Sequence, residues 1–478
     1  MPPILVELLV LGLGMFLLML EAFARHHDRR VFAFIGIVGL AGVFCVLQSF
    51  HPSEARVISA YAIDAPALFF KKFVVVTTII VLVMAMDYAD TIRKFVPGET
   101  PESGIGEFFA LPVLTCAGMM WMASAVDFIL IFVSLELVTI SFYVLVAYMR
   151  RNAASLEAGV KYLILGALST GFFVYGVTWI YGVTRQTNLF EIERVLPTIA
   201  AANQPGLLFG ALLVLVGLGF KIAAAPFQFW VPDVYQGAPT PTTAFLSVGS
   251  KAVGFIVLLR VVEALQSLRP VGEKMLFALV LLAAATLVYG NLAALPQTNF
   301  KRLLAYSSIG HAGYLLMAVA SFGAGDAGRA VVVYLAAYLL MTLLSFLILI
   351  IVAQHSEGDD IAHFNGLAKR SPFLAFSLLV AMMSLAGVPL TAGFLGKFLV
   401  FKVAYETGQF LLLALGVITV GCGFYYYLKV VRAMYWQPAP GNAAAIPVNN
   451  LSLITIALLV LFIFVFGVFP GLALGLAG

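Results

Sequence analysis

The stretch GLGFKIAAAPFQFWVPDVYQGAPTPTTAFLSVGSKAVG, residues 217–254, decides the fold. In it two apolar helical segments meet across an expected turn, PDVYQGAPTP, and each segment carries one lysine, Lys221 or Lys251, with apolar residues on both sides. A lysine near the centre of a bilayer costs about 2.5–3.5 kcal/mol on insertion scales. Pro226 cannot donate to a helical hydrogen-bond ladder, so the first segment is expected to break beside Lys221. A broken membrane helix with a charge beside the break is typical of an ion-transport site.

The composition is that of a polytopic membrane protein. Of the 478 residues, 62% are hydrophobic and 10% are charged, and the mean hydropathy is +1.05. Ordinary soluble proteins carry about 25% charged residues. The net charge of +4 is too small to indicate binding to nucleic acid. Cys45, Cys116 and Cys422 form no CxxC motif or Cys/His cluster, which argues against an iron–sulfur, zinc or disulfide framework in this chain.

About fourteen stretches are long and apolar enough to span a bilayer, which takes about 20 residues each. They lie near residues 3–22, 31–50, 68–87, 107–124, 126–148, 158–181, 206–229, 240–263, 274–293, 302–322, 330–353, 372–402, 409–433 and 450–474. The first has no basic segment before it and is expected to be a retained membrane helix rather than a signal peptide. The predicted fold class is therefore an all-α polytopic membrane protein.

Two of these stretches are interrupted, one in each half of the chain. The first break is expected at Ala223–Pro226 and the second in AGVPLTAGFLGK, from Ala386 to Lys397. Paired interruptions indicate inverted repeats with a site near the middle of the membrane. The predicted division is an N-terminal three-helix segment (1–106), a first repeat (107–263), a second repeat (274–433) and a C-terminal helix (434–478).

Basic clusters predict the orientation, because lysine and arginine favour cytoplasmic loops. An even number of spans places both termini on one side of the membrane. The clusters ARHHDRR, MRR and NFKR all fall on the other side. The expected location is a bacterial plasma (inner) membrane, crossed many times, with both termini on the periplasmic side.

Six titratable side chains inside apolar stretches are candidates for proton transfer: Glu136, Lys161, Lys221, Lys251, His311 and Lys397. An intramembrane ionisable residue is costly and is by default a functional candidate. Five of the six have neighbours at helical spacing that leave a polar or small face. These neighbours are Thr139 for Glu136, Gly217, Ala225 and Gln228 for Lys221, Ser247 and Gly254 for Lys251, Ser307 and Tyr314 for His311, and Gly393 for Lys397.

Each candidate also has a purely structural interpretation. Glu136 can be paired with a neighbouring helix for packing alone, and His311 can be a satisfied core histidine. Lys161 lies early in its span, where a lysine reaches the membrane interface by snorkelling, and the same applies more weakly to Lys397. Asp233 more readily braces its turn than carries protons.

The set of charges suits protons better than metal cations. Two unit charges about 8 Å apart interact by roughly 2 kcal/mol at an effective dielectric of about 20. Moving one charge against 100 mV takes about 2.3 kcal/mol, so steps of this kind have the right size. Lysines offer hydrogen-bond donors rather than the oxygen ligands that sodium needs. Glu136 is expected to lie close to Lys221 or to a lysine of a preceding subunit.

These motifs resemble the antiporter-like membrane subunits of respiratory complex I, and within that group subunit N. The resemblance rests on the segment from Lys221 through PFQFWVPDVYQGAPTPTTAFLSVGSKAVGF, on NFKRLLAYSSIGHAGYLLMA and on LAGVPLTAGFLGKF, and it covers roughly residues 5–475. It implies fourteen helices in which two inverted five-helix repeats each contain a broken helix. It also implies proton translocation coupled to quinone reduction by NADH:quinone oxidoreductase.

By this resemblance five of the six candidate residues have a counterpart in the family. Glu136 matches the glutamate of the fifth helix, Lys161 the lysine of the sixth, Lys221 that of the broken seventh, Lys251 that of the eighth and Lys397 that of the broken twelfth. Gln228 stands where many relatives carry histidine, so a relay there would have to use water. Lysine rather than glutamate at position 397 argues against the middle antiporter-like subunit. The lack of a long C-terminal extension argues against the largest one.

The resemblance implies that this chain holds no cofactor. NADH, FMN, iron–sulfur clusters and quinone are expected on partner subunits. The expected partners are other complex I membrane subunits, including a neighbouring antiporter-like subunit, and the lipid bilayer. Two alternatives stay open: a subunit of a multi-subunit cation/proton antiporter, and a structural membrane-arm subunit. A standalone redox enzyme is disfavoured because no GxGxxG motif follows a strand.

Overall fold

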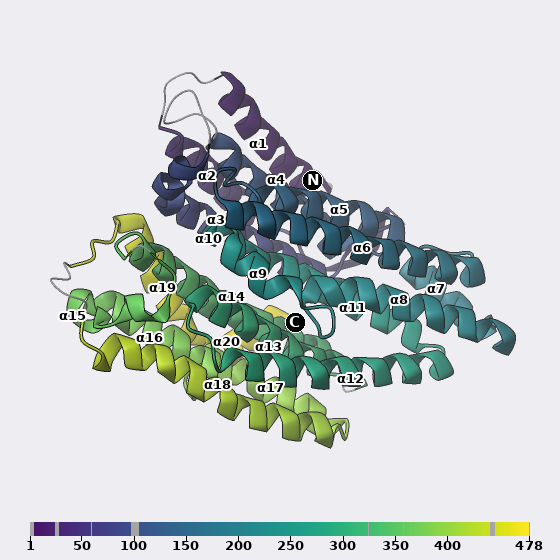
Figure 1. The fold of residues 1–478 in the computed structure, drawn as a ribbon. Coiled ribbons are helices and arrows are strands. Elements are labelled where there is room, and N and C mark those ends of the chain that lie inside the picture. The colour runs from purple at the N-terminus through teal and green to yellow at the C-terminus, as the bar shows by residue number, and fades with distance from the viewer. Residues whose placement is uncertain are drawn as a thin grey trace.

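The computed structural model describes residues 4–23, 28–58, 60–96, 105–323, 325–356, 358–439 and 445–477. Long helices lie side by side in one bundle (Figure 1). They are α1 Ile4–Phe23, α2 Arg30–Leu47, α3 Ala65–Phe95, α4 Gly106–Ser124, α5 Phe128–Val146, α6 Ala153–Thr184, α8 Gln204–Ile222, α11 Lys251–Gln266, α12 Arg269–Ala294, α13 Phe300–Ala320, α14 Ala327–Ala353, α16 Pro372–Ala386, α17 Ala392–Glu406, α18 Phe410–Trp436 and α19 Asn450–Val468.

Shorter elements connect these helices. They are α7 Leu189–Val195, α9 Trp230–Gly237, α10 Thr240–Phe245, α15 Leu367–Arg370 and α20 Pro470–Leu474, together with short 3₁₀ turns. The only strands among the described residues are β1 Ser53–Ile58 and β2 Tyr61–Ile63, which form an antiparallel hairpin that the sequence did not predict.

Every predicted span corresponds to a helix or a pair of helices, so the expected fold class is confirmed. Thirteen helices in the described part of the chain are long and apolar enough to cross a membrane, and α16 with α17 supplies the interrupted span. The turn expected between the fourth and fifth spans lies at residues 125–127, where the Asp127 carboxylate caps α5 by accepting a hydrogen bond from the Ile129 N–H (2.8 Å). Residues 24–27 of the basic cluster ARHHDRR lie outside the described residues, as do the terminal residues 1–3 and 478.

The first break follows Lys221 by one residue. Helix α8 ends at Ile222, and Ala223 adopts a left-handed conformation with φ of +65°. The chain becomes helical again at Trp230, so most of the segment expected as a turn is the helix α9 and only Ala238–Pro239 separates it from α10. The expectation of a turn over PDVYQGAPTP was therefore wrong, because this segment is the second half of the broken helix.

The second break lies where the sequence predicts it. Helix α16 ends at Ala386, and α17 begins at Ala392. Between them Leu390 has a φ of +70°, so each break contains a non-glycine residue in the left-handed region, which costs of order 1–3 kcal/mol. Such local strain persists only where the surrounding structure holds it, and it is concentrated at functional sites.

A third irregularity was not predicted. Residues Leu246–Ser250 form one turn of π-helix between α10 and α11, directly before Lys251. A π-turn inserts one extra residue into a helix and frequently marks a functional site. Sequence periodicity cannot reveal it, because the apolar pattern on either side is unchanged.

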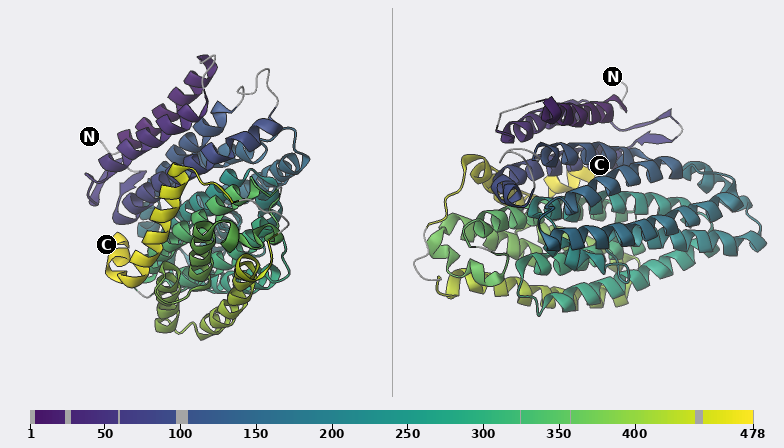
Figure 2. Two further views of the ribbon diagram at one scale, coloured as in Figure 1. Left: turned by 90° about the vertical axis from the view of Figure 1, so that its left-hand side faces the viewer. Right: turned by 45° about the horizontal axis from the view of Figure 1, so that its top comes forward.

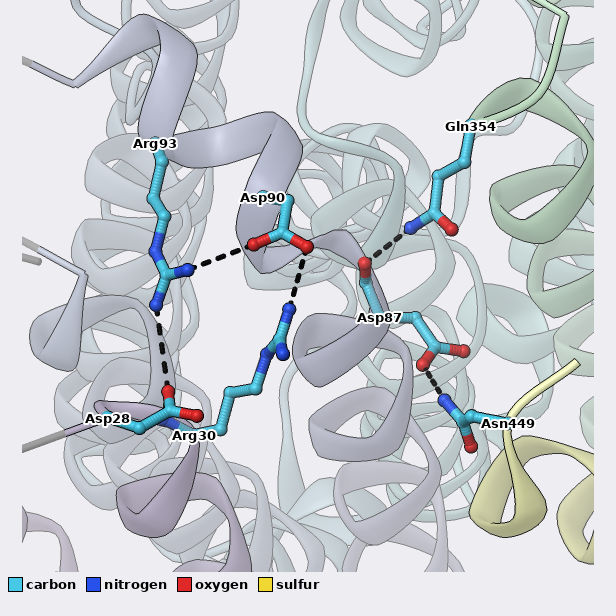
Figure 3. A network of polar contacts seen from close by, with 7 residues as sticks. All are labelled: Asp28, Arg30, Asp87, Asp90, Arg93, Gln354 and Asn449. Carbon is cyan, nitrogen blue, oxygen red and sulfur yellow. Dashed lines mark hydrogen bonds and ion pairs between the residues drawn. The ribbon is translucent and has the colours of Figure 1, made fainter. Parts of the chain in front are cut away.

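The N-terminal helices lie along one flank of the bundle. Helix α1 is at the outer edge in the right-hand view of Figure 2, while α3 packs inward against α10 and α14. At the end of α3 a polar network joins distant parts of the chain (Figure 3). Gln354, after α14, donates to the Asp87 carbonyl, and Asn449 and Ser452 of the α19 start donate to the Asp87 carboxylate. The C-terminal helix is thus anchored to the N-terminal segment.

Candidate proton-transfer site

Lys221 lies in the last turn of α8 and is 6% exposed. Its Nζ donates a hydrogen bond to Thr139 Oγ1 on α5, and no carboxylate lies within 4.0 Å of it among the described residues. A cavity of about 10 Å³ adjoins the lysine between α5, α6 and α8, and Thr139, Ser169 and Thr170 contribute hydroxyls to its wall. This volume is close to that needed to hold a single water molecule.

Glu136 is half-buried on α5, one helical turn before Thr139. Its Oε1 accepts a hydrogen bond from Thr170 Oγ1 on α6 (2.9 Å). Glu136 and Lys221 form no ion pair within 4.0 Å in the described part of the chain, so a threonine hydroxyl stands where a direct carboxylate–ammonium contact was one of the expectations. Each of the two charged groups instead binds a different threonine hydroxyl, Thr170 for Glu136 and Thr139 for Lys221.

Gly254 brings the two lysine-bearing helices together. A Cβ at this position of α11 would lie 2.8 Å from Ile222 Cγ2 and 3.6 Å from Lys221 Cβ. Only a residue without a side chain permits this approach of α11 to the end of α8. Gly254 follows Lys251 by three residues, so the face predicted for Lys251 is the one that meets Lys221.

Lys251 is 2% exposed and binds to α13. Its Nζ donates to the Ser308 carbonyl oxygen (2.6 Å) and to the Ser308 hydroxyl. The same Nζ lies 5.8 Å from the centre of the Tyr338 ring, within the range of a cation–π interaction. Lys251 therefore faces the second half of the chain.

His311 lies one turn further along α13 and is 2% exposed. Its Nδ1 is 2.7 Å from the Tyr334 hydroxyl and its Nε2 is 3.1 Å from the Tyr427 hydroxyl. The Tyr427 hydroxyl also hydrogen-bonds to Ser307, the residue predicted to share the face of His311. Both ring nitrogens thus contact groups that can donate and accept protons.

Lys397 is 5% exposed and crosses the second break. Its Nζ donates to the carbonyl oxygens of Leu385 (2.9 Å) and Ala386 (2.8 Å), the last residues of α16. A helix C-terminus carries a partial negative charge that favours a cation. The Nζ also lies 5.1 Å from the centre of the Tyr314 ring. Its deep burial excludes the snorkelling interpretation.

Gly393 allows this arrangement at the second break. A Cβ there would lie 1.9 Å from the Ser384 carbonyl oxygen, and the Gly393 N–H donates to Ser384 Oγ (3.1 Å). The start of α17 is therefore pressed against the end of α16. The small face expected beside Lys397 is thus taken up by the close contact of Gly393 with Ser384.

Lys161 stands apart from the other candidates. Its side chain is 41% exposed and forms ion pairs with Glu157 and Asp233, each at 2.7 Å. Asp233 also binds Arg302 (3.0 Å), so it links α9 to α6 and α13. The interpretation of Asp233 as a brace fits this geometry, although the segment braced is a helix.

One detail of the predicted faces was wrong. Ala225 and Gln228 were expected on the helical face of Lys221, but α8 ends at Ile222, so the helical spacing does not extend to them. Gln228 is 2% exposed, and its Oε1 has no hydrogen-bond partner among the described residues.

Sequence reasoning missed the tyrosines that separate the charges. Tyr334 and Tyr338 lie four residues apart on α14, on one helix face, and their rings lie 5.8 Å and 5.2 Å from that of His311. Their spacing of four residues could have revealed from the sequence that the two tyrosines share one helix face. Tyr427, on α18, could be placed only by the tertiary structure.

The site holds buried groups that can each bind a proton, next to hydroxyls or carbonyls. Lys221 contacts Thr139, Lys251 contacts Ser308, and His311 contacts Tyr334 and Tyr427. Glu136 contacts Thr170, and Lys397 contacts backbone carbonyls. Among the residues that the structure describes, no group of three or more His, Cys, Asp or Glu is placed to hold a metal ion.

A bundle with two broken helices and a row of buried lysines defines an antiporter-like transport subunit, and comparisons with known proteins agree. The family described as "NADH:quinone oxidoreductase/Mrp antiporter, TM" matches residues 125–423. The subunit of the Mrp complex from Dietzia sp. DQ12-45-1b has a similar fold, with a TM-score of 0.83 over 99% of this chain and 95% of that chain, at 19% identity.

Other matches are more specific. NADH-quinone oxidoreductase subunit N of Moorella thermoacetica is 38% identical over 466 residues, which cover 97% of this chain and 95% of the relative. A chain of respiratory complex I from Thermus thermophilus is 32% identical, with a TM-score of 0.80 over 99% of this chain and 100% of that chain.

The chain belongs to the NADH-quinone oxidoreductase subunit N family. It is a proton-translocating, antiporter-like, multi-pass membrane subunit of respiratory complex I, where it acts together with other subunits. The family and the general function expected from the sequence motifs are therefore confirmed.

Proposed function

We propose that protons cross this subunit along the row Glu136, Lys221, Lys251, His311 and Lys397. The observation that carries the proposal is that the three lysines of this row have hydroxyl or carbonyl partners and, in the described part of the chain, no carboxylate within 4.0 Å. A buried ammonium group without a carboxylate is costly, so a proton held there is ready to move when a neighbouring charge changes.

Hydroxyl groups carry the proton between the charged groups. Thr170 binds Glu136, Thr139 binds Lys221, and Ser308 binds Lys251. Tyr334 and Tyr427 bind the two nitrogens of His311, so a proton that arrives at one nitrogen can leave from the other. Roughly 2 kcal/mol of repulsion between charges about 8 Å apart is enough to drive one such transfer.

Lys161 serves the uptake of protons in this proposal. Its ion pairs with Glu157 and Asp233 place a partly exposed charged group on the flank of the row, at the end of the bundle where Arg302 also lies. The basic clusters assign that end to the cytoplasm.

The remaining parts of the proposal concern the surroundings of the chain. NADH oxidation, FMN, iron–sulfur clusters and quinone reduction belong to partner subunits, and a neighbouring antiporter-like subunit and lipid cover the outer helices. The chain lies in a bacterial plasma membrane with both termini on the periplasmic side, and the repeats are residues 107–263 and 274–433. Membrane-impermeant labelling tests the orientation: Arg269→Cys should react from outside whole cells, and Lys369→Cys should not.

Lys397 and Lys402 provide a matched test, since both lie on α17. Lys397 is buried against the end of α16, whereas Lys402 is 42% exposed and forms ion pairs with Asp326 and Glu406. Lys397→Ala should slow NADH-driven proton translocation in vesicles by about tenfold or more, because a positioned proton-transfer group contributes about 10²–10⁴-fold to a rate. Lys402→Ala should translocate protons at the wild-type rate.

Complex content and NADH:quinone reduction are measured in the same membranes. Equal loss of translocation in both variants would show that α17 needs charge only for assembly. Wild-type translocation by Lys397→Ala would exclude the second half of the proposed row.

A further inference from the structure

A second group of buried charges lies outside the row. It consists of Glu7 on α1, Tyr61 on β2, Lys71 on α3 and Ser124 at the end of α4, which we call the hairpin cluster. Glu7 and Ser124 are 0% exposed, and Tyr61 and Lys71 are each 1% exposed. Intramembrane charges buried to this degree are rare and usually functional.

One oxygen of Glu7 contacts both Tyr61 and Lys71. Oε1 accepts hydrogen bonds from the Tyr61 hydroxyl (2.7 Å) and forms an ion pair with Lys71 Nζ (2.8 Å). The Nζ of Lys71 also donates to the Tyr61 hydroxyl (2.6 Å). Three groups that can hold a proton are therefore in mutual contact.

The hairpin cluster also contains two orphaned polar atoms. Glu7 Oε2 and Ser124 Oγ are both buried and have no hydrogen-bond partner among the described residues. Leaving a buried acceptor unpaired costs about 1–3 kcal/mol, and more for a charged group. A buried water that needs two to four polar partners satisfies such atoms.

An ion pair between Arg260 on α11 and Asp64, directly before α3, lies next to the hairpin cluster and lines a cavity. Arg260 holds both carboxylate oxygens of Asp64 (2.9 Å each) and the Ala123 carbonyl oxygen (3.1 Å), next to Ser124. The charges of Asp64 and Arg260 also act on Lys71. Asp64, Arg260, Glu263 and Gln266 line a cavity of about 390 Å³.

The same helix leads back to the lysine row. Arg260 follows Lys251 by nine positions on α11, which is roughly 14 Å along the axis at 1.5 Å per residue. The hairpin cluster and the cavity thus lie at the end of the helix that begins at Lys251. That end is the one that the basic clusters assign to the periplasm.

A purely structural ion pair does not account for these features well. A buried ion pair is weak support for stability, because apolar residues of similar volume often replace one without loss. A pair kept for packing alone would also be expected to satisfy both carboxylate oxygens.

We propose that the hairpin cluster is a proton-exchange site through which protons leave the lysine row for the cavity at Asp64 and Glu263. Lys71 gives a proton to the Glu7 carboxylate, Glu7 gives it from Oε2 to a water that Ser124 also binds, that water passes a proton on toward the cavity, and Lys71 is reloaded from the Lys251 side, so charge and atoms balance over one cycle. The proposal rests on the proposed row as the source of protons.

The test compares three changes in the intact complex. Glu7→Gln keeps the size of the side chain and can accept the Tyr61 hydrogen bond, but it cannot exchange a proton. Glu7→Leu/Lys71→Met replaces the pair by apolar groups of similar volume, which the fold should tolerate. Arg269→Gln/Glu273→Gln removes an exposed ion pair, whose side chains are 89% and 65% exposed, and serves as the control.

Complex content, NADH:quinone reduction and proton translocation are measured in vesicles for each variant. We expect normal complex content in all of them, wild-type translocation in the control, and a loss of about tenfold or more in Glu7→Gln. The apolar double variant should be equally slow. Normal translocation by Glu7→Gln overturns the proposal, even if the double variant fails to assemble.

Lys221→Ala, measured alongside, separates the two proposals. If Lys221→Ala stops translocation while Glu7→Gln translocates normally, the hairpin cluster is structural and the row stands. If both variants translocate normally, the row itself is wrong.

Discussion

At the scale of single residues, the three lysines of the proposed row are held by neutral groups. Lys221 binds a threonine hydroxyl, Lys251 a serine and Lys397 two carbonyl oxygens at a helix end. Neutral partners stabilise an ammonium group less than a carboxylate does, so protons move between sites at a smaller cost in free energy. The tyrosines and His311 fill the spaces between the lysines.

Tyr427→Phe tests one hydroxyl in this series. The change keeps the ring but removes the group that bridges Ser307 and His311 Nε2. A hydrogen bond contributes about 1 kcal/mol, which corresponds to about fivefold in rate. Proton translocation should fall by about that factor with normal complex content. The neighbouring Tyr425 is 64% exposed, and Tyr425→Phe should have no effect. Equal rates in the two variants would remove Tyr427 from the path.

At the scale of elements, the two helix breaks position the charges. Each break exposes backbone carbonyl groups at a helix end in the interior, where water is scarce and a lysine can satisfy them. Lys397 does this across the second break, and Lys221 lies one residue before the first. A helix break and a buried lysine therefore occur together at both positions, and at the second break the lysine binds the exposed carbonyl groups.

Gly393→Ala should disturb the second break without altering any charge. The new Cβ would fall 1.9 Å from the Ser384 carbonyl oxygen, so α17 must move away from α16 and from the carbonyls that bind Lys397. Overpacking of this kind costs about 1–3 kcal/mol. We expect a lower unfolding temperature of the purified complex and slower proton translocation. Gly421, on α18, has open space around its Cα, so Gly421→Ala is the control and should match the wild type. A stable, fully active Gly393→Ala variant would contradict this role.

The sequence predicted the elements better than their contacts. Pro226 and the glycines near Lys397 revealed both breaks, because proline and glycine act locally on the backbone. The π-turn before Lys251 left no trace in the apolar pattern. Glu7 and Lys71 were overlooked because each lies near the end of its span, where a charge can reach water, and only the hairpin that covers them reveals their burial.

At the scale of the whole molecule, two halves of the chain meet at the lysine row. Gly254 joins α8 to α11 beside Lys221 and Lys251, and Ser308 joins Lys251 to the second half. The N-terminal helices flank this assembly and are tied to α14 and α19 through Asp87 (Figure 3). The proposed proton path therefore runs through the interior, where the helices of the two halves meet.

The rate of NADH-driven proton translocation in vesicles, compared between Lys221→Ala and Lys221→Arg, tests this account most directly. Alanine removes the ammonium group next to a water-sized cavity, so the helix should survive while translocation and coupled quinone reduction fall by about tenfold or more. Arginine keeps the charge but does not release its proton in proteins, so it should perform nearly as badly. Complex content should be unchanged in both. Wild-type translocation in the alanine variant, or full rescue by arginine, would show that Lys221 carries no protons and would contradict the account.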